Sequence, residues 1–149
     1  ANLCLYFKKS FSPSSLFFDP GFSVIDAAVV ELRGGGLMMV VKNENEDPPE
    51  KNLRVTFAEN IEAGFPVEVS GPITGEYWCE GPSPLCVGDR LYVYFDKYME
   101  GSYGAVVSED GGLTWADVSE TVSFPPGARH GTAFKVPSRL MRKLRRLGP

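Results

Sequence analysis

Short runs of apolar, β-branched and aromatic residues recur along the first 137 positions, and Gly, Pro, Asn and Asp separate them. Before residue 138 almost no stretch repeats apolar residues at the three-to-four spacing of an amphipathic helix. Runs of this length and composition are typical of β-strands. The sequence therefore predicts an all-β fold, with hairpin turns at 34–36 and 88–89 and strands at 3–7, 23–32, 37–41, 53–57, 66–69, 91–95, 105–107 and 132–136.

The runs repeat with a period of about 50 residues. Residues 25–30 lie 54 positions before 79–84, and residues 37–41 lie 54 before 91–95. Four-stranded antiparallel units at such a period are typical of propeller blades, whose first strands line a central channel. We predict an incomplete ring of about 2.75 blades in 1–138: two strands in 3–18, full blades in 23–69 and 79–118, and one strand in 130–137.

Residues 108–115 match the pattern S-x-D-x-G-x-T-W. The pattern resembles the Asp-box of sialidases and related propellers. We expect the carboxylate of Asp110 to accept backbone N–H bonds across a hairpin turn, a glycine to take a positive φ, and Trp115 to pack between neighbouring blades. This role would make Asp110 a structural residue and a poor catalytic candidate.

Asp26, Glu80 and His130 fall at equivalent positions of the repeat, at the start of three successive first strands. If these strands converge on one channel, two carboxylates and an imidazole would share a cavity. Such a group suits acid/base chemistry on a glycosidic bond. The alternative is that each is an ordinary polar residue at the end of a strand.

Three stretches, 18–26, 78–82 and 129–132, resemble the blade-start signatures of glycoside hydrolase family 43, which comprises five-bladed propeller arabinanases, xylosidases and related enzymes. The resemblance spans about residues 3–137. Its most specific part is Glu-Gly-Pro after an aromatic residue, followed by Gly-Asp-Arg-Leu-Tyr-Val-Tyr-Phe.

The resemblance implies that Glu80 is the general acid and that Asp26 raises its pKa and orients it. Trp78 and Arg129 become candidate sugar contacts, by ring stacking and by hydrogen bonds to hydroxyls. His130 matches a channel histidine that in some members helps hold a central ion or water, and no other cofactor or metal is expected.

Asp96 ends the second strand of its blade, where we expect it beside the ligand or on the surface. Asp19 is expected to cap a turn. In the family the general base is an aspartate on the first blade. No acidic residue precedes Asp19 here, so no base is identified in this sequence.

The resemblance implies a hydrolase that cleaves O-glycosidic bonds of oligo- or polysaccharides, and the incomplete ring leads us to expect that it acts as an oligomer. Alternatives are a non-catalytic carbohydrate-binding or assembly module, an interaction protein on a partial propeller, and a fragment. An open propeller leaves sheet edges and blade faces unpaired. We therefore expect a homodimer in which residues 130–137 of one chain complete the blade begun by 3–18 of the other.

Charge narrows the choice of partners. The chain carries 15 basic and 19 acidic residues, and five of the basic ones lie in 139–149. The remaining body is acidic, which argues against nucleic-acid binding. No apolar run is long enough to cross a membrane and no signal peptide is visible, so the default expectation is a cytoplasmic protein.

The basic tail, 139–149, is predicted to begin as a short amphipathic helix with Leu140, Leu144 and Leu147 on one face. A frayed or body-docked helix is the favoured interpretation over a role at membranes or nucleic acid. Cys4, Cys79 and Cys86 form no C-x-x-C, so the sequence shows no zinc or redox motif.

Overall fold

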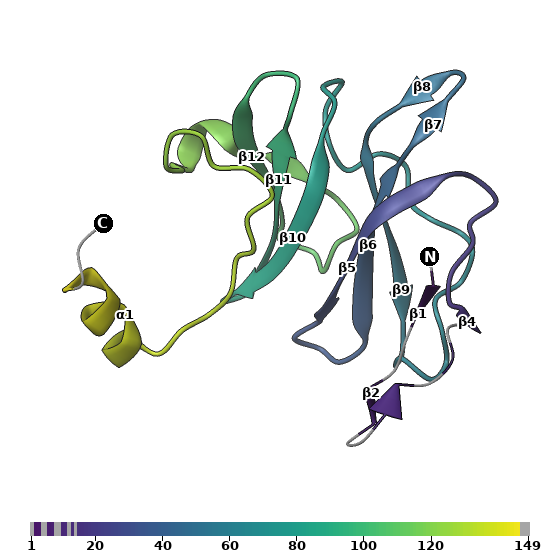
Figure 1. The fold of residues 1–149 in the computed structure, drawn as a ribbon, viewed down its shortest axis with the longest axis horizontal. Coiled ribbons are helices and arrows are strands. Elements are labelled where there is room, and N and C mark those ends of the chain that lie inside the picture. Colours follow the sequence, from purple (N-terminus) through teal and green to yellow (C-terminus); the bar gives the residue numbers. More distant parts are fainter. Residues whose placement is uncertain (1, 4–5, 8–9, 12, 14, 147–149) are drawn as a thin grey trace.

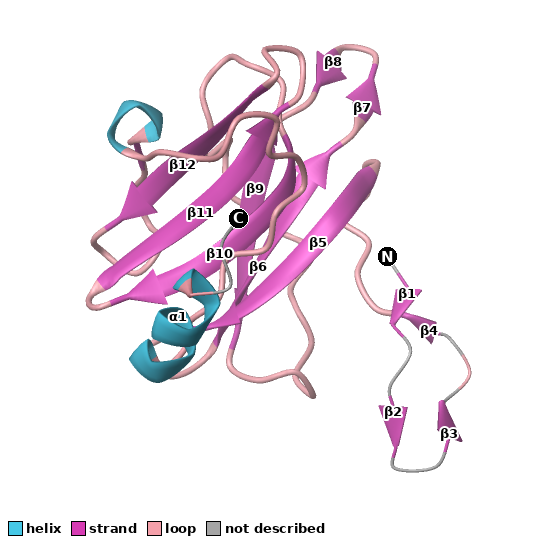
Figure 2. Cartoon of the chain, turned by 60° about the vertical axis from the view of Figure 1, so that its left-hand side comes forward, coloured by secondary structure: helices cyan, strands magenta, loops and turns pink. Residues whose placement is uncertain are grey.

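The computed structural model describes residues 2–3, 6–7, 10–11, 13 and 15–146, and most of its regular structure is β. Two larger antiparallel sheets stand side by side (Figures 1 and 2). The first contains β5 (Val24–Glu31), β6 (Leu37–Asn43) and β9 (Leu53–Ala58). The second contains β10 (Glu80–Val87), β11 (Arg90–Lys97), β12 (Ser102–Ser108) and β13 (Ala116–Asp117). The all-β prediction is confirmed at this level.

Glycine-containing turns join the first two strands of each sheet, as predicted. The β5–β6 hairpin turns through 34–36, where Gly35 and Gly36 take positive φ. The β10–β11 hairpin turns through Gly88 and Asp89, with Val87 paired to Arg90. Gly88 has a φ of 62°, which L-residues rarely adopt.

The main core lies between the two sheets. Alternate residues of β11 (Leu91, Val93 and Phe95) are buried against the first sheet, as expected for period-two strands. The middle strand β6 is buried on both faces and supplies Met39 and Val41 to a second cluster with Phe18 and Phe65. From the first sheet, the main core takes Met38, Val40, Leu53 and Val55.

Two predicted strands are wrong. Residues 66–69 form no strand, although the chain just after them runs along β9 through Ser70 N to Val55 O (2.8 Å) and Ile73 N to Leu53 O (2.8 Å). Residues 132–136 form no strand either; a hydrogen bond from Ala133 N to the Ser83 side chain (2.8 Å) holds this segment to β10. The strand that was to complete a partner's blade is therefore not present as a strand.

The N-terminal prediction lies partly outside the described residues. The structure shows short pairs of β1 (Asn2–Leu3) with β4 (Ser15–Leu16) and of β2 (Tyr6–Phe7) with β3 (Ser10–Phe11). A further hairpin, β7 (Asn45–Glu46) with β8 (Pro49–Glu50), was not predicted.

The turn at 108–115 forms the predicted lock. Asp110 Oδ1 accepts hydrogen bonds from Leu113 N (3.0 Å) and Thr114 N (2.9 Å), and Gly112 has a φ of 100°. Trp115 packs against the main core, and a Cβ on Gly112 would lie 2.9 Å from the Phe57 ring of the first sheet. The turn therefore fastens the two sheets together.

Two helices follow the second sheet: η1 (Ser119–Thr121) and α1 (Ser138–Arg145). The predicted tail helix is confirmed over 138–145, and Leu147 lies outside the described residues. No residue of α1 is buried, and its last turn carries Arg142, Lys143 and Arg145. Within the described part of the chain, no helix combines the length and apolar character needed to cross a membrane.

Candidate functional site

A β-bulge begins each first strand. Pairing with the second strand shifts between Ile25 and Ala28 in β5 and between Glu80 and Ser83 in β10. Asp26 (φ 52°) and Gly81 (φ 59°) take the left-handed conformation inside these bulges. Asp26 is thus the structural counterpart of Gly81, not of Glu80. The predicted alignment is wrong by one residue, because the two bulges are separated by 55 residues and not by 54.

The three predicted residues nevertheless meet. One ligand atom from each of Asp26, Glu80 and His130 lies within 4.8 Å of the others. Gly81 N donates to Asp26 Oδ2 (3.0 Å), and His130 Nε2 lies 2.8 Å from Glu80 Oε1. A Cβ on Gly81 would come within 3.0 Å of His130 Nδ1, so the absent side chain lets the imidazole approach.

Positive charge surrounds Glu80. Lys42 Nζ lies 3.4 Å from its Oε2, and Arg129 Nη2 lies 3.6 Å from its Oε1. Burial raises the pKa of Glu80, but the hydrogen bond to His130 and the charge of Lys42 outweigh it and hold the pKa below its ordinary value. The expectation that the pKa of this carboxyl is raised is therefore wrong for the free protein, in which Glu80 is ionised at neutral pH.

Asp96 lies inside the molecule, not on its surface. Its side chain is fully buried and Oδ2 accepts a hydrogen bond from Arg129 Nε. Its Oδ1 has no hydrogen-bond partner among the described residues. A buried acceptor without a partner costs free energy, so this carboxylate is held in place at some expense of stability.

Aromatic rings adjoin the charged cluster. Trp78 is 40% exposed, and its ring centroid lies 6.3 Å from that of Tyr98. Lys42 Nζ sits 5.0 Å from the Tyr98 centroid. Exposed aromatic faces of this kind can stack on sugar rings.

The sequence analysis missed Lys42, Glu44 and Tyr98. Lys42 is 2% exposed and pairs with Glu44 Oε2 at 2.5 Å. Burial lowers the pKa of Lys42, but Glu44, Tyr98 and Glu80 outweigh it and raise the pKa, so the ammonium stays charged. The available signal was a lysine that continues the apolar run of β6, 54 residues before Asp96.

Two predictions remain: the turn cap at Asp19 and the ion or water near His130. Asp19 caps a turn as predicted, because its Oδ1 accepts from Gly21 N at 2.9 Å. In the described part of the chain, Asp26, Glu80 and His130 are the group whose donor atoms come close enough to share a cation. Because His130 and Glu80 already bond to each other, we assign no cation to them.

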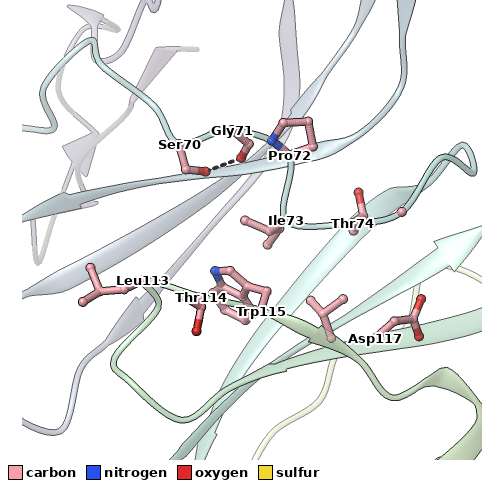
Figure 3. Close-up of a pocket in the computed structure, with 11 residues that line it drawn as sticks. Ser70, Gly71, Pro72, Ile73, Thr74, Leu113, Thr114, Trp115 and Asp117 are labelled. Atoms are coloured by element: carbon pink, nitrogen blue, oxygen red, sulfur yellow. Dashed lines mark hydrogen bonds between the residues drawn. The ribbon is translucent and has the colours of Figure 1, made fainter.

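A separate hollow of about 520 Å³ lies between the segment 70–75 and the end of the locked turn (Figure 3). Trp115 and Asp117 line it, but Asp117 already accepts from the Tyr77 hydroxyl (2.5 Å) and from Ser119 N (2.8 Å). None of the clustered residues reaches this hollow, so it is not part of the candidate site.

Comparison with known proteins identifies a structural likeness. No protein-family model and no curated protein sequence matches the chain. The crystal structure of a thermostable family-43 glycoside hydrolase is similar, with a TM-score of 0.55 and 18% sequence identity. The likeness covers 78% of this chain and 46% of that one, so the chain spans less than half the length of the hydrolase. At this identity the likeness concerns the fold alone: it agrees with the β-rich architecture and suggests a propeller-like arrangement.

Proposed function

We propose that this chain carries the proton-donor half of a glycoside hydrolase centre, built on blades of a β-propeller whose first strands, β5 and β10, line the channel. The observation that carries the proposal is the convergence of Asp26, Glu80 and His130 within 4.8 Å, from three separate segments. The likeness to a family-43 hydrolase supports the same chemistry.

The surroundings of the cluster suit a carbohydrate. A sugar ring stacks on the exposed face of Trp78, beside Tyr98. Arg129 donates hydrogen bonds to hydroxyls, and the buried Asp96 carboxylate holds its guanidinium. Arg129 lies beside Glu80, because it contacts that carboxylate as well.

Glu80 donates its proton to the oxygen of the glycosidic bond while the bond from that oxygen to the anomeric carbon breaks. The sugar is left with oxocarbenium character and takes the oxygen of a water, whose proton goes to a general base outside this proton-donor half. Asp26 orients the donor by holding Gly81 N. A bound sugar excludes water from Glu80, and this desolvation raises the pKa of the carboxyl toward the range that a donor needs.

The test is hydrolysis of a panel of aryl-glycosides and of arabino- and xylo-oligosaccharides. On the oligosaccharides, Glu80→Gln should lower kcat/KM by about 100-fold or more. Glu31→Gln is the matched control, because Glu31 is exposed at the far end of β5. Hydrolysis by Glu80→Gln at the rate of the control would refute the proposal.

The second candidate is a carbohydrate-binding module without turnover. The lowered pKa of Glu80 favours it, because an ionised carboxylate accepts hydrogen bonds from sugar hydroxyls and cannot donate a proton. Calorimetric binding of an oligosaccharide that survives Glu80→Gln, with no hydrolysis by the wild type, would favour this function over the first.

A further inference from the structure

Two buried charges occupy the same place in the two sheets. On the second strand of the first sheet, Lys42 pairs in register with Ile25; on the second strand of the next sheet, Asp96 pairs with Glu80. Ile25 and Glu80 each immediately precede the left-handed residue of a bulge. Lys42 and Asp96 are therefore structural equivalents, and they are 2% and 0% exposed.

Each buried charge reaches forward to the start of the next unit. Lys42 of β6 contacts Glu80 at the start of β10, and Asp96 of β11 contacts Arg129. Arg129 precedes the left-handed residue His130 (φ 44°), as Glu80 precedes Gly81. The same ion pair thus occurs twice with its charges exchanged.

From this repetition we infer that Lys42 is the positioning residue of Glu80, and that the Asp96–Arg129 pair is the same device with the signs reversed. The inference rests on the proposed function only in treating Glu80 as the working group. Lys42 is not proposed as a catalytic residue, because its side chain is buried.

Residues other than Glu80 already hold the Lys42 ammonium in place. Glu44 holds its ammonium at 2.5 Å, and Lys51 holds the other oxygen of Glu44 at 2.8 Å. The Tyr98 ring lies against the same ammonium. Lys42 therefore presents a charge at a set place, to which Glu80 Oε2 is drawn while His130 holds Oε1.

A buried ion pair is rarely the most stable solution, because apolar residues of similar volume are often equal or better. β6 is otherwise apolar from Leu37 to Val41, so an apolar residue at position 42 would extend its core face. Keeping a charge there favours orientation of the partner over stability. Charged or titratable side chains from several elements lie around Glu80. They are Asp26 of β5, Lys42 of β6 with Glu44 just after that strand, Asp96 of β11 with Tyr98 just after that strand, and Arg129 and His130.

The experiment follows the carboxyl ¹³C signal of Glu80 by NMR as a function of pH, together with oligosaccharide affinity. Lys42→Met should raise the titration midpoint by about one pH unit, and Lys42→Arg should keep it near that of the wild type. Lys97→Met is the control, because Lys97 lies over the Tyr77 ring and pairs with Asp117, not with Glu80. Lys42→Gln keeps the test valid if the methionine variant does not fold.

An unchanged Glu80 midpoint in folded Lys42→Met or Lys42→Gln would overturn the inference, as would an equal shift in Lys97→Met. The readout needs no turnover. A shifted midpoint in a protein that hydrolyses nothing would support the positioning role and refute the proposed hydrolysis. We further expect Lys42→Met to weaken oligosaccharide binding several-fold while Lys42→Arg restores it.

Discussion

At the scale of single residues, the site is built on backbone that most side chains avoid. Asp26 and His130 are the non-glycine residues with positive φ in the described chain, and both belong to the cluster. Asp and His are among the few L-residues that tolerate this region, and the conformation persists where neighbours enforce it. For Asp26 the enforcing contact is the hydrogen bond from Gly81 N.

Gly81 gives a direct test of this packing. Gly81→Ala and Gly101→Ala place a Cβ at nearly the same φ, 59° and 63°, but only the first meets a neighbour, His130. Both should lose about 1 kcal/mol of stability from the backbone term. Only Gly81→Ala should also move the His130 ring signals in NMR spectra and weaken oligosaccharide binding. Equal effects of the two variants would argue against a packed imidazole.

The pH dependence distinguishes the two candidate functions. A proton donor must be protonated, so hydrolysis should rise as pH falls from neutral toward the pKa of Glu80 in the complex. A binding site that uses the ionised carboxylate should instead lose affinity as pH falls through the lowered pKa of Glu80. Parallel rate and calorimetry profiles from neutral pH down to about pH 3, which lies below the ordinary carboxyl pKa of about 4.3, measure both.

Sequence reasoning found the cluster because the repeat placed Asp26, Glu80 and His130 together. It missed the sign of the Glu80 pKa shift, because Lys42 at the end of an apolar run reads as an ordinary strand terminus. It placed Asp96 beside the ligand or on the surface, but the side chain is buried and bonded to Arg129, 33 residues further along the chain. Contacts between distant residues with no shared motif leave no local pattern.

At the scale of elements, the locked turn joins the sheets through one carboxylate. Hydrogen bonds from the Thr114 hydroxyl, the Thr114 backbone and Ser108 hold the pKa of Asp110 well below its ordinary value. A depressed folded-state pKa contributes stability above the unfolded value and loses it as pH falls.

Asp110→Asn should therefore lower the urea midpoint at pH 7, and the gap to wild type should shrink below about pH 4, near the pKa of an unfolded aspartate. Glu109→Gln is the control: it removes a neighbouring charge whose partner is the exposed Arg90. A gap that is independent of pH would show that the charge of Asp110 does not supply the stability.

Strands were predictable where apolar or β-branched runs flank a glycine turn, as in β5 and β6, or follow one, as in β11. The strand predictions failed at 66–69 and 132–136, although these segments are similar in composition to the segments that do form strands. Each runs beside a sheet, but Pro66, Pro72 and Pro137 cannot donate to a ladder, and side-chain bonds replace regular pairing. Whether a segment becomes a strand depends on a neighbouring strand with which it can pair, and composition does not reveal that neighbour.

At the scale of the whole molecule, one face of the second sheet remains open. A largely apolar groove of about 450 Å³ lies there, and Tyr94 and Phe124 line it together with Phe134, which is 70% exposed. Met141 and Leu144 of α1 form another wall. The homodimer stays a prediction, and this face is where it can be tested.

Sedimentation equilibrium at micromolar concentration should show a dimer that Phe134→Ser weakens, because an exposed phenylalanine contributes to association and little to the monomer. Leu113→Ser is the control, since Leu113 is 79% exposed on the distant turn. A stable wild-type monomer at that concentration would contradict the prediction.

The most direct test of the account is the dependence of hydrolysis on the leaving group. A proton donor matters most when the leaving oxygen is basic, as in an oligosaccharide, and least when it is a nitrophenolate. If Glu80 is the donor, Glu80→Gln should lose about 10²–10⁴-fold in kcat/KM on arabino- or xylo-oligosaccharides and far less on nitrophenyl glycosides. Equal losses on both substrates, or no hydrolysis of either by the wild type, would contradict the assignment of Glu80 as a proton donor.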